Sequence, residues 1–132
     1  MCYMLDTDIC SYVLRSRPAS VKARFDDAGP GSLAISTVVL AELLFGAERH
    51  PKAAVISREI RDFVSRLEVI PWDEDAAEHY GSLRAALEKK GKPLGAMDLM
   101  IAAHARSRGA TLVSNDVRHF RKVEGLLVAN WV

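Results

Sequence analysis

The sequence is poor in residues that hold small proteins together by covalent or metal cross-links. Its 132 residues include two cysteines, Cys2 and Cys10, and no Cys-x-x-Cys pair. Two cysteines alone cannot supply the four ligands of a structural zinc site, so we expect two buried free thiols. A chain of this length buries roughly 68% of its unfolded surface. A hydrophobic core therefore suffices, and we expect a single domain over residues 1–132.

Long apolar runs and an excess of charge of either sign are also absent. No stretch approaches the ~18 residues of a membrane-spanning helix, and residues 1–8 contain acids but no basic signal-peptide segment. We therefore expect no membrane association and a cytoplasmic location. The 18 Lys and Arg residues against 17 Asp and Glu give a net charge of +1. This balance neither supports nor excludes a nucleic-acid partner.

Short apolar runs alternate with amphipathic segments along the chain. This alternation is typical of β-α-β units and predicts an α/β fold around a mostly parallel sheet of about five strands. The expected strands are Tyr3–Asp6, Leu33–Ser36, Val69–Trp72, Thr111–Ser114 and Leu127–Asn130. Helices are expected to start near Ile9, Pro18, Ser36 or Thr37, Ile56, Asp73, Met97 and Val117.

Four carboxylates occupy the positions where such a fold brings side chains together. Asp6 ends the first expected strand, and Asp116 follows the fourth by two residues. Asp98 lies in the first turn of a helix, and Glu42 interrupts the apolar helix that leaves the second strand. Because ligands bind at the carboxyl ends of parallel strands, we expect these acids to converge on one edge of the sheet.

Converging carboxylates require a counter-charge. Two of them ~5 Å apart repel by roughly 3 kcal/mol at an effective dielectric constant of 20, so either a proton or a cation is held. Oxygen ligands match Mg²⁺ or Mn²⁺ better than Zn²⁺. Such an ion lowers the pKa of a bound water and stabilises charge on a phosphoryl group, which is the chemistry of phosphodiester hydrolysis.

Each acid taken alone also has a structural interpretation. Asp6 and Asp8 are equally consistent with helix N-caps, Asp98 with a favourable position at a helix dipole, and Asp116 with a turn. The adjacent Ser114 and Asn115 suit either a turn or hydrogen bonds to a metal-bound water or a phosphate. His119 lies three residues after Asp116 and is a weaker candidate for contact with a substrate.

Several segments taken together resemble the PIN-domain ribonucleases, and more narrowly the VapC toxins of VapBC toxin–antitoxin pairs. They run in order from about residue 3 to 131. The segments are Met4–Asp8, Ala41–Gly46, Gly95–Ala105, Leu112–Asp116, His119–Phe120, Val123–Leu126 and Asn130–Trp131.

The resemblance implies an α/β/α sandwich and RNA cleavage that depends on Mg²⁺ or Mn²⁺. Asp6, Glu42, Asp98 and Asp116 match the family's acidic quartet. It further implies that Asp6 and Asp98 are the firmest metal ligands and that Asp116 and Glu42 complete or orient the site. A metal-activated water would attack the phosphodiester in line and leave a 5′-phosphate.

The same resemblance implies a homodimer and a cognate VapB-type antitoxin. The implied substrate is a structured RNA, chiefly tRNA, and the most similar branch suggests the anticodon loop of initiator tRNA. Many relatives carry Asn where this chain has Asp8. That fifth acid is a candidate outer-shell ligand, with Ser114 and Asn115 as further neighbours of the site.

Two other functions remain open at this level. Asp6-Thr7-Asp8 after an apolar strand is also typical of haloacid-dehalogenase-type phosphatases, in which the first Asp is the nucleophile and the second the general acid/base. A non-enzymatic Mg²⁺-binding interaction domain is the other alternative. Asp8→Asn separates the first two functions, because it would inactivate a phosphatase and leave a nuclease mostly active.

Overall fold

The sheet has five strands, all parallel, in the order β3-β2-β1-β4-β5. The structure is a computed structural model and describes residues 2–132. The strands are β1 (Tyr3–Leu5), β2 (Leu33–Ser36), β3 (Glu68–Ile70), β4 (Thr111–Val113) and β5 (Leu127–Ala129). The expected α/β fold is confirmed. The third strand ends at Ile70 rather than Trp72, because Pro71 cannot donate to the ladder and the Trp72 N–H turns to Thr37 Oγ1 at 3.1 Å.

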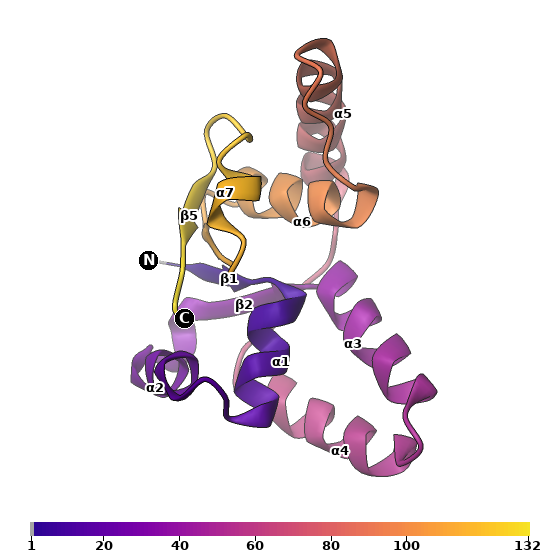
Figure 1. Ribbon diagram of the computed structural model, residues 1–132, viewed down its shortest axis with the longest axis vertical. Helices are drawn as coiled ribbons and strands as arrows, with labels where there is room; N and C mark the ends of the chain where they lie inside the picture. The colour runs from indigo at the N-terminus through magenta and orange to yellow at the C-terminus, as the bar shows by residue number, and fades with distance from the viewer. Residues whose placement is uncertain (1) are drawn as a thin grey trace.

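Helices cover both faces of the sheet (Figure 1). One face carries α1 (Thr7–Arg15), α2 (Ala19–Asp27), α3 (Thr37–Arg49) and α4 (Ala53–Val64), and a 3₁₀ turn at Pro30–Ser32 leads into β2. The other face carries α5 (Glu74–Lys89), α6 (Ala96–Ser107) and α7 (Val117–Phe120). The chain therefore changes faces after β3, and the strands on the two sides of β1 are reached through helices on opposite faces.

Polar side chains at the strand ends start the helices that follow. Asp6 caps α1 by accepting the N–H of Ile9, so this helix begins at Thr7, two residues earlier than expected. Ser36 caps α3 by accepting the N–H of Val38, as expected. Asp8 is an exposed residue of the first turn of α1 and not its cap.

The core lies on both faces of the sheet. Its largest fully buried side chains include Leu5, Ile35, Leu112, Phe63 and Phe120. Cys10 is a buried free thiol, and Cys2 is also free but only partly buried. Among residues 2–132, none of the helices combines the length and the apolar character that crossing a membrane requires.

The outer helices are held to the core by aromatic packing far from the carboxylates. Phe63 of α4 is fully buried and stacks on Phe25 of α2 with ring centroids 5.4 Å apart. We expect Phe63→Ala to lower the free energy of unfolding by about 3–5 kcal/mol, because it leaves a cavity in a packed core. Urea denaturation measures this change. Arg61→Ala, at an exposed position of the same helix, serves as the control and should change stability by less than about 0.5 kcal/mol.

Candidate active site

The carboxyl ends of β1 and β4 meet where the strand order reverses. From β1 the chain proceeds to β2 on one side, whereas β4 lies on the other side of β1. Asp6 and Ser114 directly follow these two strands, and the Asp6 N–H donates to the carbonyl of Val113 at 3.1 Å. Such a reversal point is where open α/β sheets bind their ligands.

Asp6 is a buried carboxyl at this point, with 7% of its surface exposed. Its Oδ1 accepts the N–H of Ile9 at 2.9 Å. Burial first, and then the charges of Asp8 and Asp98, raise the pKa of Asp6 to about 6, although hydrogen bonds from Ser114 and Ile9 act to lower it. The structure thus brings Asp6, Asp8 and Asp98 close enough to interact electrostatically.

Glu42 is joined to the start of α1 through Thr7. The Thr7 hydroxyl donates to Glu42 Oε1 at 2.8 Å, linking the residue next to Asp6 with the second turn of α3. Glu42 is partly buried, and this contact directs its carboxylate toward the start of α1. No sequence pattern pointed to Thr7 as a site residue. Its position directly after Asp6, at the start of a helix, was the one feature that could have indicated it.

Asp98 and Asp116 are connected through His119. Asp98 lies in the first turn of α6, as expected, and its Oδ2 is 3.2 Å from His119 Nε2. Asp116 caps α7, with its Oδ1 accepting the His119 N–H at 3.3 Å. The Asp116 N–H in turn donates to Ser114 Oγ at 2.9 Å. His119 therefore contacts a carboxylate of the candidate site. The sequence had suggested contact with a substrate for this residue.

Asn115 ties the segment after β4 to α1. Its side-chain amide donates to the Tyr12 hydroxyl at 3.4 Å, and the Arg15 guanidinium lies 5.3 Å from the Tyr12 ring centroid. Tyr12 had no predicted role, because its partner is more than a hundred positions away (|i−j| = 103). Ser114 is buried and Asn115 exposed, so they face different surroundings although they are neighbours.

The donor chemistry of the crevice fits a hard divalent cation. Asp6, Asp98, Asp116 and Glu42 offer only carboxylate oxygens, and every charge found to act on Asp6 is negative. An incoming Mg²⁺ or Mn²⁺ would relieve that repulsion. Within residues 2–132, however, no group of three or more His, Cys, Asp or Glu side chains lies close enough together to hold a metal ion.

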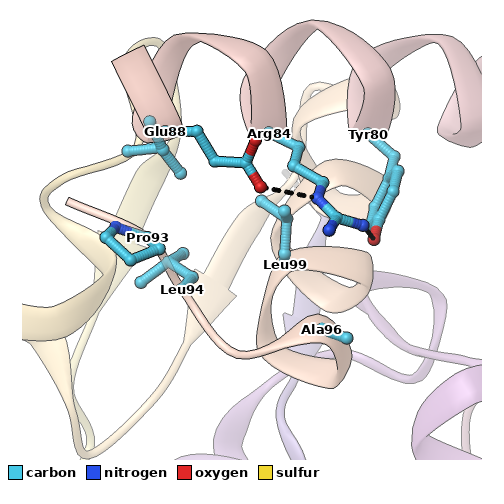
Figure 2. A pocket seen from close by; sticks show the side chains of 8 residues that line it. Tyr80, Arg84, Glu88, Pro93, Leu94, Ala96 and Leu99 are labelled. Carbon is cyan, nitrogen blue, oxygen red and sulfur yellow. Dashed lines mark hydrogen bonds and ion pairs between the residues drawn. The ribbon is translucent and has the colours of Figure 1, made fainter. Parts of the chain in front are cut away.

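A separate pocket lies between α5 and the start of α6 (Figure 2). Arg84 in this pocket is held by Glu88 and by the Tyr80 hydroxyl, each at 3.1 Å. Although Leu99 lines it next to Asp98 in sequence, none of the predicted site residues does so. The charged side chains of this pocket pair with one another. The candidate active site therefore lies elsewhere, at the carboxyl ends of β1 and β4, where Asp6 and Ser114 follow the strands; this region is called the crevice.

Comparisons with known proteins show the family to which the chain is related. Residues 3–126 match the sequence model of the PIN domain. The chain is 44% identical to the tRNA(fMet)-specific endonuclease VapC of Shigella flexneri over 129 residues, which are 98% of this chain and 97% of the relative. It is 42% identical to Ribonuclease VapC2 of Haemophilus influenzae over 130 residues, 98% of each protein.

A solved structure shares the whole fold. The crystal structure of VapBC2 from Rickettsia felis bound to a DNA fragment from its promoter contains a chain that matches with a TM-score of 0.94 and 38% identity. The match covers 100% of both chains. The arrangement of helices on both faces of a five-stranded parallel sheet therefore occurs in a known structural family.

The raised pKa of Asp6 predicts a pH-dependent stability of the metal-free protein. Between pH 3.8 and about 6 the folded protein keeps a proton that the unfolded chain releases, so stability falls as the pH rises through this window. A shift of about two pH units corresponds to about 3 kcal/mol. Asp6→Asn stays neutral and can still accept the Ile9 N–H. We expect it to exceed the wild type in stability by about 1–3 kcal/mol above pH 6 and to match it below pH 4.

Urea denaturation in EDTA from pH 4 to pH 8 measures this difference. Asp27→Asn, at an exposed position at the end of α2, should follow the wild-type pH dependence throughout. A wild-type protein more stable than Asp6→Asn at pH 7.5 would show that the buried carboxylate is not under electrostatic strain.

The contact between Thr7 and Glu42 can be removed with little change in shape. We expect Thr7→Val to lower RNA cleavage about 10-fold or more, because partners that orient a site carboxylate typically contribute 10–100-fold. Thr7→Ser keeps the hydroxyl and should keep most of the activity. Initial rates at saturating RNA, with melting temperatures as a folding check, measure the effect. Equal rates for Thr7→Val and Thr7→Ser would exclude a role for the hydrogen bond.

Proposed function

The chain belongs to the PIN-domain family and, within it, to the VapC ribonucleases, and we propose that the acidic crevice at β1 and β4 hydrolyses RNA. The protein is then the endoribonuclease toxin of a toxin–antitoxin pair, carried by one domain over residues 1–132. The observation that supports this most strongly is Asp6, a buried carboxyl with a pKa raised to about 6 and acidic neighbours. Family membership also argues against the phosphatase and the non-enzymatic alternatives.

The proposed roles follow from the contacts of each side chain. Asp6 and Asp98, with Asp116, would hold a divalent metal, Mg²⁺ or Mn²⁺. A bound divalent ion lowers the pKa of water and stabilises charge on the phosphoryl group. Glu42, oriented by the Thr7 hydroxyl at 2.8 Å, would accept a hydrogen bond from the attacking water and direct it in line with the bond that breaks. Cleavage then leaves a 5′-phosphate.

Residues around the acids keep this arrangement in place. The Ile9 N–H fixes the buried Asp6 carboxylate, and Ser114 fixes the backbone of Asp116. Asn115 is exposed beside the crevice and is proposed to contact a phosphate or a bound water. Asp8 is exposed and raises the pKa of Asp6, which suits an outer ligand rather than a group that transfers protons.

The substrate and partners are proposed from the relatives. The Shigella flexneri relative, at 44% identity, is named for tRNA(fMet), so we propose a tRNA and, more narrowly, the anticodon loop of initiator tRNA. The solved relative is a complex named VapBC2, which supports a VapB-type antitoxin. A groove that begins at Thr7 and Glu42 and includes Phe45, 61% exposed, is a suitable surface for it. A homodimer in the cytoplasm completes the proposal.

Purified, antitoxin-free protein should cut initiator tRNA at a discrete position when Mn²⁺ or Mg²⁺ is present. We expect EDTA or Asp98→Ala to lower the rate by about 100-fold or more, since losing a ligand should cost at least as much as losing a residue that only orients one. Asp8→Asn should keep most of the activity. Sequencing of the new 5′ ends, with total RNA as a parallel substrate, identifies the cut.

Two results would contradict the proposal. A cut that persists in EDTA and in Asp98→Ala would assign it to a contaminating nuclease or to another site. Turnover of a phosphate monoester that Asp8→Asn abolishes, without any cut in RNA, would favour the phosphatase chemistry instead. Melting temperatures of both variants close to that of the wild type ensure that lost activity is not lost folding.

A further inference from the structure

His119 is the one histidine that contacts a carboxylate among the residues the structure describes. Its Nε2 lies 3.2 Å from Asp98 Oδ2. The imidazole tautomer that carries its hydrogen on Nε2 donates to this carboxylate oxygen. His104 pairs with Ser36 instead, and His50 accepts a backbone N–H. Among the described residues, neither forms an ion pair with a carboxylate.

Contacts within α7 involve both the backbone and the ring of His119. Its backbone N–H donates to the Asp116 carboxylate at 3.3 Å, and its ring meets the Phe120 ring edge-on with centroids 5.4 Å apart. Phe120 is buried in the core, and the His119 side chain is 26% exposed. The contact with the buried Phe120 therefore restricts the orientation of the imidazole ring.

Asp98 has much less support of its own. Its side chain is 50% exposed, and within residues 2–132 the bond to His119 is the one hydrogen bond found for its carboxylate. An exposed carboxylate on the first turn of a helix samples several rotamers. Holding it in one of them costs conformational entropy, which the hydrogen bond to His119 offsets before metal binding.

We propose that His119 is a positioning residue that orients the Asp98 carboxylate for metal binding and couples it to Asp116. This inference rests on the proposed function, in which both Asp98 and Asp116 bind the metal. Hydrogen-bond partners of metal-ligating carboxylates typically contribute 10–100-fold in metal affinity or activity. The contribution of His119 should therefore be visible in metal binding itself, without RNA.

The test is calorimetric titration of Mn²⁺ into the metal-free full-length protein at pH 7.5. We expect His119→Ala to bind Mn²⁺ about 10–100-fold more weakly than the wild type. His119→Gln keeps an N–H donor at the end of a side chain of similar reach and should recover part of the affinity. Neither change removes the backbone N–H that Asp116 accepts. Arg118→Ala, at an exposed position of the same helix, should bind like the wild type.

The outcomes separate this inference from the function on which it rests. Wild-type Mn²⁺ affinity in His119→Ala would overturn it, and slower tRNA cleavage in that variant would then assign His119 to RNA contact. A wild-type protein that binds no Mn²⁺ would overturn the proposed function as well. If His119→Ala fails to fold, His119→Gln decides. An affinity stronger than that of Asp98→Ala supports a donor role for His119, and an affinity as weak as that of Asp98→Ala contradicts it.

Discussion

The carboxylate of Asp6 is buried at the end of the central strand β1, and the negative charges of neighbouring acids act on it. Burial and the charges of Asp8 and Asp98 raise its pKa to about 6. At neutral pH the carboxylate is nevertheless ionised, so the folded protein holds a negative charge that it has not neutralised. A divalent cation that binds there removes the repulsion. The same unfavourable charge that weakens the metal-free fold thus favours binding of the metal.

The sheet topology creates this concentration of charge. Because β1 and β4 are adjacent and parallel, the residues that follow them meet, although they are more than a hundred positions apart in the sequence. The helices on both faces then contribute one acid each, Glu42 from α3 and Asp98 from α6. The structural and functional interpretations of these acids are compatible. Asp6 caps α1 and Asp116 caps α7 with one carboxylate oxygen each, so capping does not occupy both oxygens of either carboxylate.

Local patterns in the sequence were enough to predict the strands, the helix starts at Ser36 or Thr37 and at Asp73, and the edge of the sheet at which the residues after β1 and β4 meet. Strand ends and helix starts are determined by neighbouring residues, so the positions of Asp6 and Asp98 followed from them. The hydrogen-bond partners of these acids could not be predicted in this way. Thr7 bonds to Glu42, Asn115 to Tyr12 and His119 to Asp98 across different elements. Such contacts depend on how helices pack on the sheet, and periodicity carries no information on that.

The most direct test of this account is the change in melting temperature on adding Mn²⁺ at pH 7.5, compared between the wild type and Asp6→Asn. If a cation relieves the charge of Asp6, Mn²⁺ raises the melting temperature of the wild type in a concentration-dependent way. Asp6→Asn, already neutral at this position, should start from a higher melting temperature and gain little from the metal. An equal gain in both proteins, or none in the wild type, would contradict a central role for the buried carboxylate.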